Sequence, residues 1–101
     1  MEKRRPHYRL EAIKAVVAIG GSTAFTNAAL RGVKAMKISS AEAISVVLAL
    51  ENRHFYKSMT THDDHRIWQD VYHALCSNGR WAYIKLTLRD DGAVVIQFKE
   101  I

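Results

Sequence analysis

Apolar residues recur at helical spacing through the first half of the chain. The first stripe predicts a helix over residues 10–19 and consists of Leu10, Ile13, Val16 and Val17. Gly20 and Gly21 follow directly, and glycine is typical of the position just after a helix. We therefore expect the first helix to end at this pair.

A second helix is predicted over residues 26–36. Thr26 is placed to act as its N-cap, because a hydroxyl oxygen can accept a hydrogen bond from a free amide of the first turn. Leu30 and Val33 would then face inward. Gly32 weakens this prediction, because glycine is a poor residue for a helix interior.

A third helix begins with a capping box. Ser39 is followed three residues later by Glu42, the spacing at which each side chain bonds the other residue's backbone amide. The helix is expected to end near Leu50. Its predicted buried face consists of Ala41, Ile44, Val47 and Leu48.

From His54 onward the hydrophobic period changes to two and predicts strands at 54–61, 66–72, 81–89 and 93–99. In the third strand, the apolar set is Ala82, Ile84, Leu86 and Leu88, against Trp81, Tyr83, Lys85, Thr87 and Arg89. In the fourth, Val94, Ile96 and Phe98 alternate with Val95, Gln97 and Lys99. The predicted fold class is α+β, with N-terminal helices packed on one face of a C-terminal antiparallel sheet.

The alternation also predicts how the last two strands pair. Apolar sets on neighbouring strands must share a face, so even-numbered residues pair with even. A three-residue loop, 90–92, satisfies this condition and places Gly92 at the left-handed position that such loops need. The resulting pairs are Arg89 with Ala93, Leu88 with Val94, Lys85 with Gln97, and Tyr83 with Lys99.

Composition narrows the class of protein. The chain has 101 residues, of which 49% are hydrophobic and 25% charged, so we expect a single domain over residues 1–101. Cys76 is the one cysteine, which excludes an internal disulfide. No apolar run reaches the roughly 18 residues that cross a bilayer, so no membrane partner and a cytoplasmic location are expected. The net charge of +5 favours a polyanionic partner such as RNA or an acidic protein.

Two clusters of polar residues are candidates for chemistry. The first is the polar sheet face with Tyr83, Lys85, Gln97 and Lys99, which suits a phosphate but is equally consistent with an ordinary solvated face. The second is the segment from His62 to His65, whose histidines and aspartates could serve acid–base chemistry, cap a turn or hold a metal ion. Trp68 stands beside Gln69 in a strand whose alternation does not decide which face is buried.

Several stretches of the sequence resemble the MqsR family of bacterial toxins. They are residues 1–4, Pro6 with His7, residues 55–61, Asp64 with His65, residues 67–72, residues 83–85 and residues 98–100. The match is loose between about 18 and 50, and His73 with Ala74 departs from the family pattern. The resemblance therefore rests mainly on the strand segments and the two ends of the chain.

The resemblance implies a RelE-like fold and a toxin of a type II toxin–antitoxin system. It implies an endoribonuclease that cuts mRNA near GC-containing triplets without the ribosome. It also implies a cognate antitoxin with a zinc-binding domain and a helix-turn-helix domain. The catalytic residues of the family fall on Lys57, Gln69, Tyr83 and Lys99. We add Lys85, Gln97 and His65 as candidate substrate-binding residues, and we expect no metal ion or other cofactor.

These residues suggest a chemistry. Lys57 and Lys99 would stabilise the charge that develops on the phosphate, and because like charges lower each other's pKa, one lysine could act as a base. Tyr83 is a candidate acid or stacking platform, and Gln69 would orient the substrate. The alternative function is a non-catalytic basic module that binds RNA or an antitoxin within a repressor complex.

Overall fold

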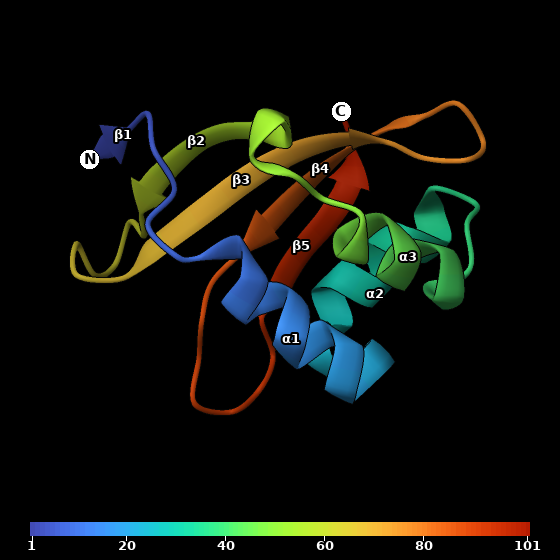
Figure 1. Cartoon of the computed structure of the whole chain (residues 1–101), viewed down its shortest axis with the longest axis horizontal. Coiled ribbons are helices and arrows are strands. Elements are labelled where there is room, and N and C mark those ends of the chain that lie inside the picture. The colour runs from blue at the N-terminus through green and yellow to red at the C-terminus, as the bar shows by residue number, and fades with distance from the viewer.

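A computed structural model describes residues 1–101. It contains the helices α1 (Leu10–Gly20), α2 (Asn27–Ala35) and α3 (Ser40–Leu48), with short 3-10 turns η1 (Gly21–Ala24) and η2 (Asn52–His54). The strands are β1 (Glu2–Lys3), β2 (Phe55–Thr60), β3 (Trp68–Leu75), β4 (Trp81–Leu86) and β5 (Val95–Glu100). Every neighbouring pair is antiparallel, and the strands lie in sequence order. Figure 1 shows this order, with the helices grouped beside β5. The predicted α+β class is confirmed.

The predicted helices form, with local corrections. The Thr26 hydroxyl accepts a hydrogen bond from the amide of Ala29, and the Ser39 hydroxyl accepts one from the amide of Glu42. The capping box is only half formed, because the Glu42 carboxylate accepts a hydrogen bond from Ser77 instead. The prediction for the buried face of α3 is confirmed at Val47 and wrong at Ala41, which is exposed. Ala43 is buried in its place.

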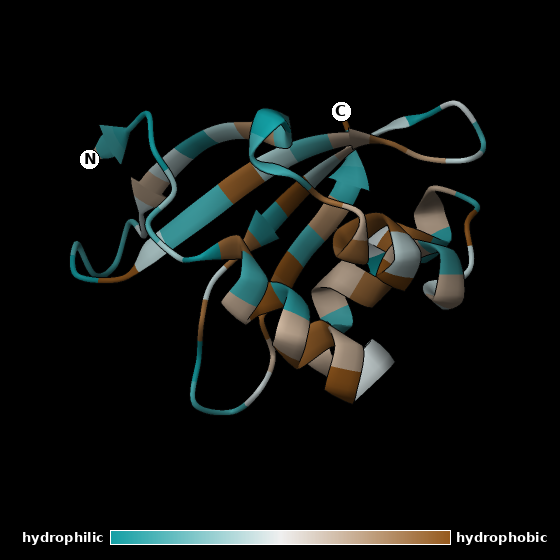
Figure 2. Cartoon of the chain, in the orientation of Figure 1, coloured by the Kyte–Doolittle hydropathy of each residue, from teal (hydrophilic) through white to brown (hydrophobic).

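One face of the sheet and the helices enclose a single hydrophobic core. In β4, Ala82, Ile84 and Leu86 are fully buried and pack with Ile13 and Val17 of α1. This is the even-numbered face that the alternation predicts, and Figure 2 shows hydrophobic and hydrophilic segments alternating along the strands. We call it the helix face, and the opposite side the open face. No helix in the protein is long and apolar enough to cross a bilayer.

Helix α2 lies directly against the outer strand β5. A Cβ atom built on Gly32 would lie 1.8 Å from the carbonyl oxygen of Phe98, which no real side chain could do. The glycine that weakens the helical pattern is therefore the residue that permits this close approach. Just before the start of α2, the amide of Val94 donates to the carbonyl of Ala24 and the amide of Thr26 donates to the carbonyl of Val95, so residues 24–26 also bond to this edge.

The last hairpin is only partly as predicted. Tyr83 pairs with Lys99 and Lys85 with Gln97, which confirms the predicted register in the middle of the strands. The pairs of Leu88 with Val94 and Arg89 with Ala93 are wrong, because the register shifts after Lys85 and Leu86 pairs with Val95. At this shift, β5 also contacts residues 24–26. The pattern of the hairpin residues alone could not predict these contacts. Gly92 does have the expected positive φ, 81°.

The connecting segment between β4 and β5 is consequently longer than three residues. It spans residues 87–94, and Leu88, which was expected on the apolar face, is 44% exposed. The other end of β3 corrects the sequence prediction in the opposite direction. This strand continues to Leu75, three residues past its predicted end at Tyr72.

The N-terminal segment is tied to the sheet by one buried carboxylate. Asp70 of β3 is 1% exposed and accepts hydrogen bonds from the amides of His7 and Tyr8 and from the Ser58 hydroxyl. This anchor holds the chain so that β1 pairs with β2. Trp68 lies on the same side of the sheet, with the His7 ring stacked 5.3 Å from it, which answers the question its alternation left open.

Candidate active site on the open face

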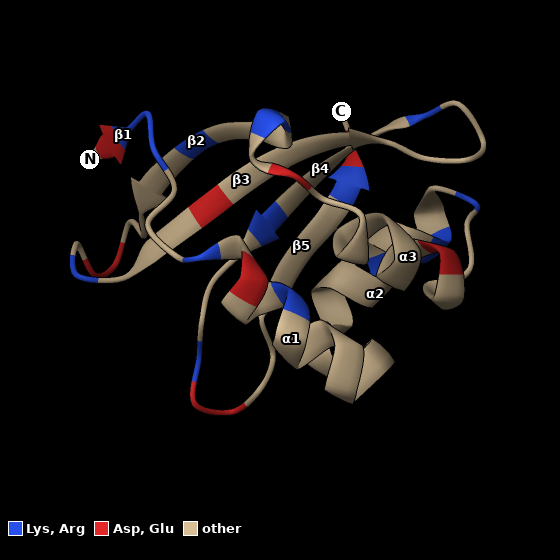
Figure 3. Cartoon of the chain, viewed as in Figure 1, with Lys and Arg blue, Asp and Glu red and all other residues tan.

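Register places a row of residues across four strands of the open face. Lys57 of β2 pairs with Val71 of β3, Val71 pairs with Lys85 of β4, and Lys85 pairs with Gln97 of β5. We call these four residues the lysine row. Side chains directly opposite one another in a sheet have Cβ atoms about 4.5–5.5 Å apart, so Lys57 and Lys85 flank Val71 closely. In Figure 3 the basic segments on β2 and β4 are these lysines.

A second row lies one step along the strands. His73 of β3 pairs with Tyr83 of β4, and Tyr83 pairs with Lys99 of β5. Residues two apart on a strand share a face and lie about 7 Å apart, so this row is adjacent to the lysine row. The amines of Lys99 and Lys85 lie 5.0 and 5.9 Å from the centre of the Tyr83 ring. Tyr83 is therefore bracketed by cations.

Gln69 completes the set of four proposed catalytic residues on this face. It pairs with Met59, and it lies two residues before Val71 on β3, so it shares the face of the lysine row. Lys57, Gln69, Tyr83 and Lys99 thus belong to one surface formed by four adjacent strands. Of the added candidates, Lys85 and Gln97 lie on that surface as well.

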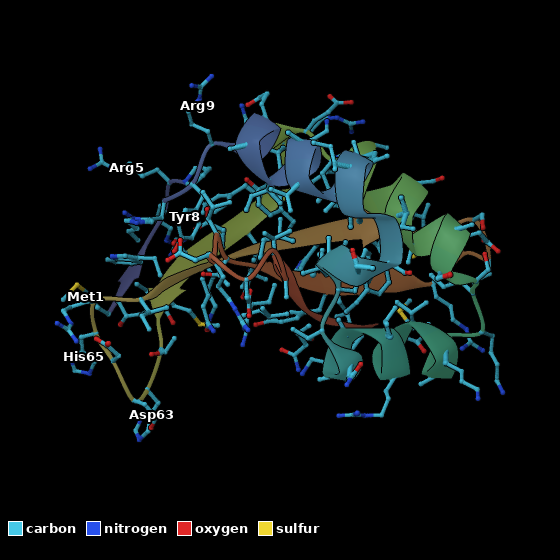
Figure 4. The ribbon with its side chains drawn as sticks, turned by 90° about the horizontal axis from the view of Figure 1, so that it is seen from below. Met1, Arg5, Tyr8, Arg9, Asp63 and His65 are labelled. Carbon is cyan, nitrogen blue, oxygen red and sulfur yellow. The ribbon has the colours of Figure 1, made fainter.

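His65 does not join this group. It is exposed in the loop between β2 and β3, at the outer end of the sheet, and Figure 4 shows it at the same end of the molecule as Met1. Its neighbour Asp64 forms an ion pair with Arg66, which donates side-chain hydrogen bonds to both carboxylate oxygens. No three His, Cys, Asp or Glu side chains of the protein gather at a spacing that would hold a metal ion.

An acidic residue also reaches the site. The carboxylate of Glu2 on β1 lies 3.1 Å from the amine of Lys57 and accepts a hydrogen bond from it. In Figure 3 the acidic segment of β1 lies beside the basic segment of β2. This contact raises the pKa of Lys57, so the lysine stays protonated. The expectation that repulsion between cations would lower the pKa of Lys57 is therefore wrong.

Lys85 behaves in the opposite way. Burial lowers its pKa, and the charges of Lys99 and Lys57 lower it further. Burial raises the pKa of the Tyr83 hydroxyl, although the charge of Lys57 opposes the shift. At neutral pH, Tyr83 is therefore a protonated group that can donate a hydrogen bond. Unlike Lys57, Lys85 therefore lies in surroundings that favour loss of its proton.

Three residues of this surface escaped the sequence analysis. Glu2 lies in a two-residue strand with no periodicity to read. Tyr56 is the extra residue of a β-bulge between Phe55 and Lys57, which turns its ring toward the open face. His73 follows the predicted end of its strand by one residue. A longer third strand paired with β4 in the predicted alternation would have placed His73 opposite Tyr83 on the open face.

Comparison with known proteins gives the family. The model of the family described as "Motility quorum-sensing regulator, toxin of MqsA" matches residues 5–100. A relative from Escherichia coli, mRNA interferase toxin MqsR, is 39% identical over 100 residues, which is 99% of this chain and 99% of the relative. Such a match over nearly the full length of both chains shows that this protein belongs to the MqsR toxin family.

Proposed function

We propose that this chain is an mRNA endoribonuclease, the toxin of a type II toxin–antitoxin system, and that residues 1–101 act as a single catalytic domain. The observation that carries the proposal is the pairing of Lys57, Lys85, Tyr83 and Lys99 in two adjacent rows of the open face. Lysine side chains around a tyrosine suit a phosphodiester whose negative charge increases during cleavage. The printed name of the relative, mRNA interferase toxin, supports the same activity.

Cleavage would use the 2′-hydroxyl of the RNA as the nucleophile. The hydroxyl loses its proton to a base, its oxygen attacks the adjacent phosphorus, and the bond from phosphorus to the 5′-oxygen breaks. Lys57, held protonated by Glu2, and Lys99 would stabilise the charge on the phosphate oxygens. This scheme needs neither a metal ion nor another cofactor.

Two further roles follow from the pKa directions. Tyr83 stays protonated, so its hydroxyl would donate a proton or a hydrogen bond to the leaving 5′-oxygen. Lys85, whose pKa is lowered, is the candidate base for the 2′-hydroxyl. Gln69 and Gln97 would orient the substrate through hydrogen bonds, and His65 would contact RNA beyond the scissile step.

Recognition and regulation are proposed from the family. The substrate would be mRNA cut near GC-containing triplets without the ribosome, in the cytoplasm. The partner would be an antitoxin of the MqsA kind, with a zinc-binding and a helix-turn-helix domain. The antitoxin could cover the lysine row or add a strand to an edge of the sheet. We favour the edge on the family resemblance, and inhibition there would be indirect, by blocking the access of RNA along the rim of the open face.

The direct test is incubation with labelled mRNA in EDTA. We expect site-selective cleavage by the wild type and mapped ends that cluster at GC-containing triplets. The Lys57→Ala variant should bind RNA but cut it far more slowly. A wild-type protein that shifts RNA on a gel without cutting it would support the binding module instead. Activity lost in EDTA and restored by Mg²⁺ or Zn²⁺ would overturn the metal-independent scheme.

A further inference from the structure

A row of three neighbouring rings crosses the open face beside the lysine row. The Tyr56 ring lies parallel to the His73 ring, with centres 4.3 Å apart and planes 20° apart. His73 in turn lies 5.8 Å from the Tyr83 ring, at 43°. The three residues come from β2, β3 and β4, and we call them the aromatic row. It lies where the bulge in β2 turns Tyr56 toward the open face.

The outer end of this row is open to solvent. Tyr56 is 51% exposed although its ring lies on His73. The amine of Lys57 lies 5.6 Å from the centre of the Tyr56 ring, and the amine of Lys99 lies 5.0 Å from that of Tyr83. Flat apolar surface next to cations is the arrangement with which proteins bind single-stranded nucleic acid, since bases stack on rings and phosphates pair with lysines.

His73 is held by stacking and not by hydrogen bonds. Its Nε2 atom is buried and has no hydrogen-bond partner. A polar atom in this state weakens the fold, so the ring is poorly explained as a stabilising element. Burial also lowers the pKa of His73, which keeps the imidazole uncharged at neutral pH. An uncharged ring between two tyrosines extends the stacking surface without adding to the repulsion among the lysines.

We propose that Tyr56 and His73, together with Tyr83, form a nucleobase-binding platform for a nucleotide next to the scissile phosphate. The inference rests on the proposed function, since it takes single-stranded RNA as the substrate. The two rows are one step of the sheet apart, about 7 Å, so a phosphate on the lysine row brings its neighbouring base over the aromatic row. The platform would thus position the nucleotide beside the cut, and it adds two residues to those already assigned.

The test measures binding separately from cleavage. The probe is a short RNA of mRNA sequence with a 2′-deoxy substitution at the mapped cut, which removes the nucleophile, and its dissociation constant is read by fluorescence anisotropy. We expect Tyr56→Leu to weaken binding roughly tenfold and Tyr56→Phe to change it little, because phenylalanine keeps the ring. His73→Leu should weaken binding and His73→Phe should preserve it.

A matched control is available on the same sheet. Trp81 is also 51% exposed and shares the face of Tyr83, but it lines a separate cavity with residues of α3 and lies outside the aromatic row. Trp81→Leu should leave the dissociation constant unchanged. An equal loss in Trp81→Leu and Tyr56→Leu would mean that exposed aromatic area in general binds RNA, and would overturn the platform.

Abasic substitutions locate the stacked base. In the wild type, removing one base at a time should weaken binding sharply at one position beside the cut, and Tyr56→Leu should be insensitive at that position alone. If Tyr56→Leu loses affinity at every abasic position just as the wild type does, the inference is overturned.

If the wild type binds the RNA and cleaves the unmodified strand while Tyr56→Leu does both equally well, the platform fails and the nuclease stands. If the wild type neither binds nor cuts, the proposed function itself fails. A loss of antitoxin binding alone in Tyr56→Leu would assign the row to the protein partner.

Discussion

The two faces of the sheet are built for opposite purposes. On the helix face, Ala82, Ile84 and Leu86 are fully buried among apolar neighbours. On the open face, the same strand carries Tyr83 and Lys85, and the pKa of Lys85 is lowered by burial first and then by the charges of Lys99 and Lys57. The helix face gains stability by burying apolar side chains, while the open face holds like charges together against their repulsion. Groups held at such a cost are typical of sites kept for function.

A small substitution where the helices pack on the sheet should lower the stability of the protein more than one on the open face. Gly32→Ala would place a methyl group 1.8 Å from the carbonyl oxygen of Phe98. Alanine gains about 1 kcal/mol in helix propensity, but the clash with backbone costs more than about 3 kcal/mol, so the variant should be strongly destabilised. Urea denaturation measures the change.

Gly79→Ala is the matched control for that variant. Gly79 has a φ of 83°, but a Cβ atom there would meet nothing within 4 Å. Its substitution should cost only on the order of 1 kcal/mol, from backbone strain alone. Equal stability losses in the two variants would show that the close approach of α2 to β5 is not the reason for the glycine at 32.

A substitution on the open face should change the rate of RNA cleavage and leave the stability of the fold nearly unchanged. Lys99 is exposed, and its ring neighbour is Tyr83. Under the proposed mechanism, Lys99→Ala should lower the cleavage rate on the order of 10²–10³-fold and leave the melting temperature nearly unchanged. Single-turnover cleavage and a thermal melt, run on the same preparation, measure both. Full activity in a folded Lys99→Ala protein would remove this residue from the mechanism.

Sequence reasoning was most successful where one physical rule acts alone. Alternation placed Tyr83 opposite Lys99, because side chains of β4 and β5 must sort into a buried and an exposed set. It failed at Leu88, which follows the register shift between β4 and β5, and it assigned no face to Tyr56, which lies in the bulge of β2. It could not find Glu2, whose position depends on a distant anchor, the buried carboxylate of Asp70. The family resemblance supplied Lys57 and Gln69, which no periodicity marks as functional.

A stabilising substitution should sharpen the contrast further. Lys85 is partly buried beside two other lysines, and its lowered pKa means that the folded protein holds the charged form at a cost. Lys85→Met keeps an unbranched side chain of similar length and removes the charge, so it should raise the free energy of unfolding by up to about 1 kcal/mol while weakening RNA binding. Destabilisation by Lys85→Met would mean that the lysine row does not repel as described.

The smallest effect expected is a pH dependence of stability that comes from the aromatic row. Burial lowers the pKa of His73 below its ordinary value of about 6.5, so the unfolded chain takes up this proton at a higher pH than the folded protein does. Stability should therefore fall as the pH drops below about 6.5. His73→Phe should reduce that fall, measured as the difference in unfolding free energy between pH 7.5 and 5.5. Tyr56→Leu should reduce it as well, because the Tyr56 ring covers His73 at 4.3 Å. An unchanged pH dependence in both variants would show that the Tyr56 ring does not bury His73 enough to lower its pKa, so that the open face, unlike the helix face, leaves its side chains solvated.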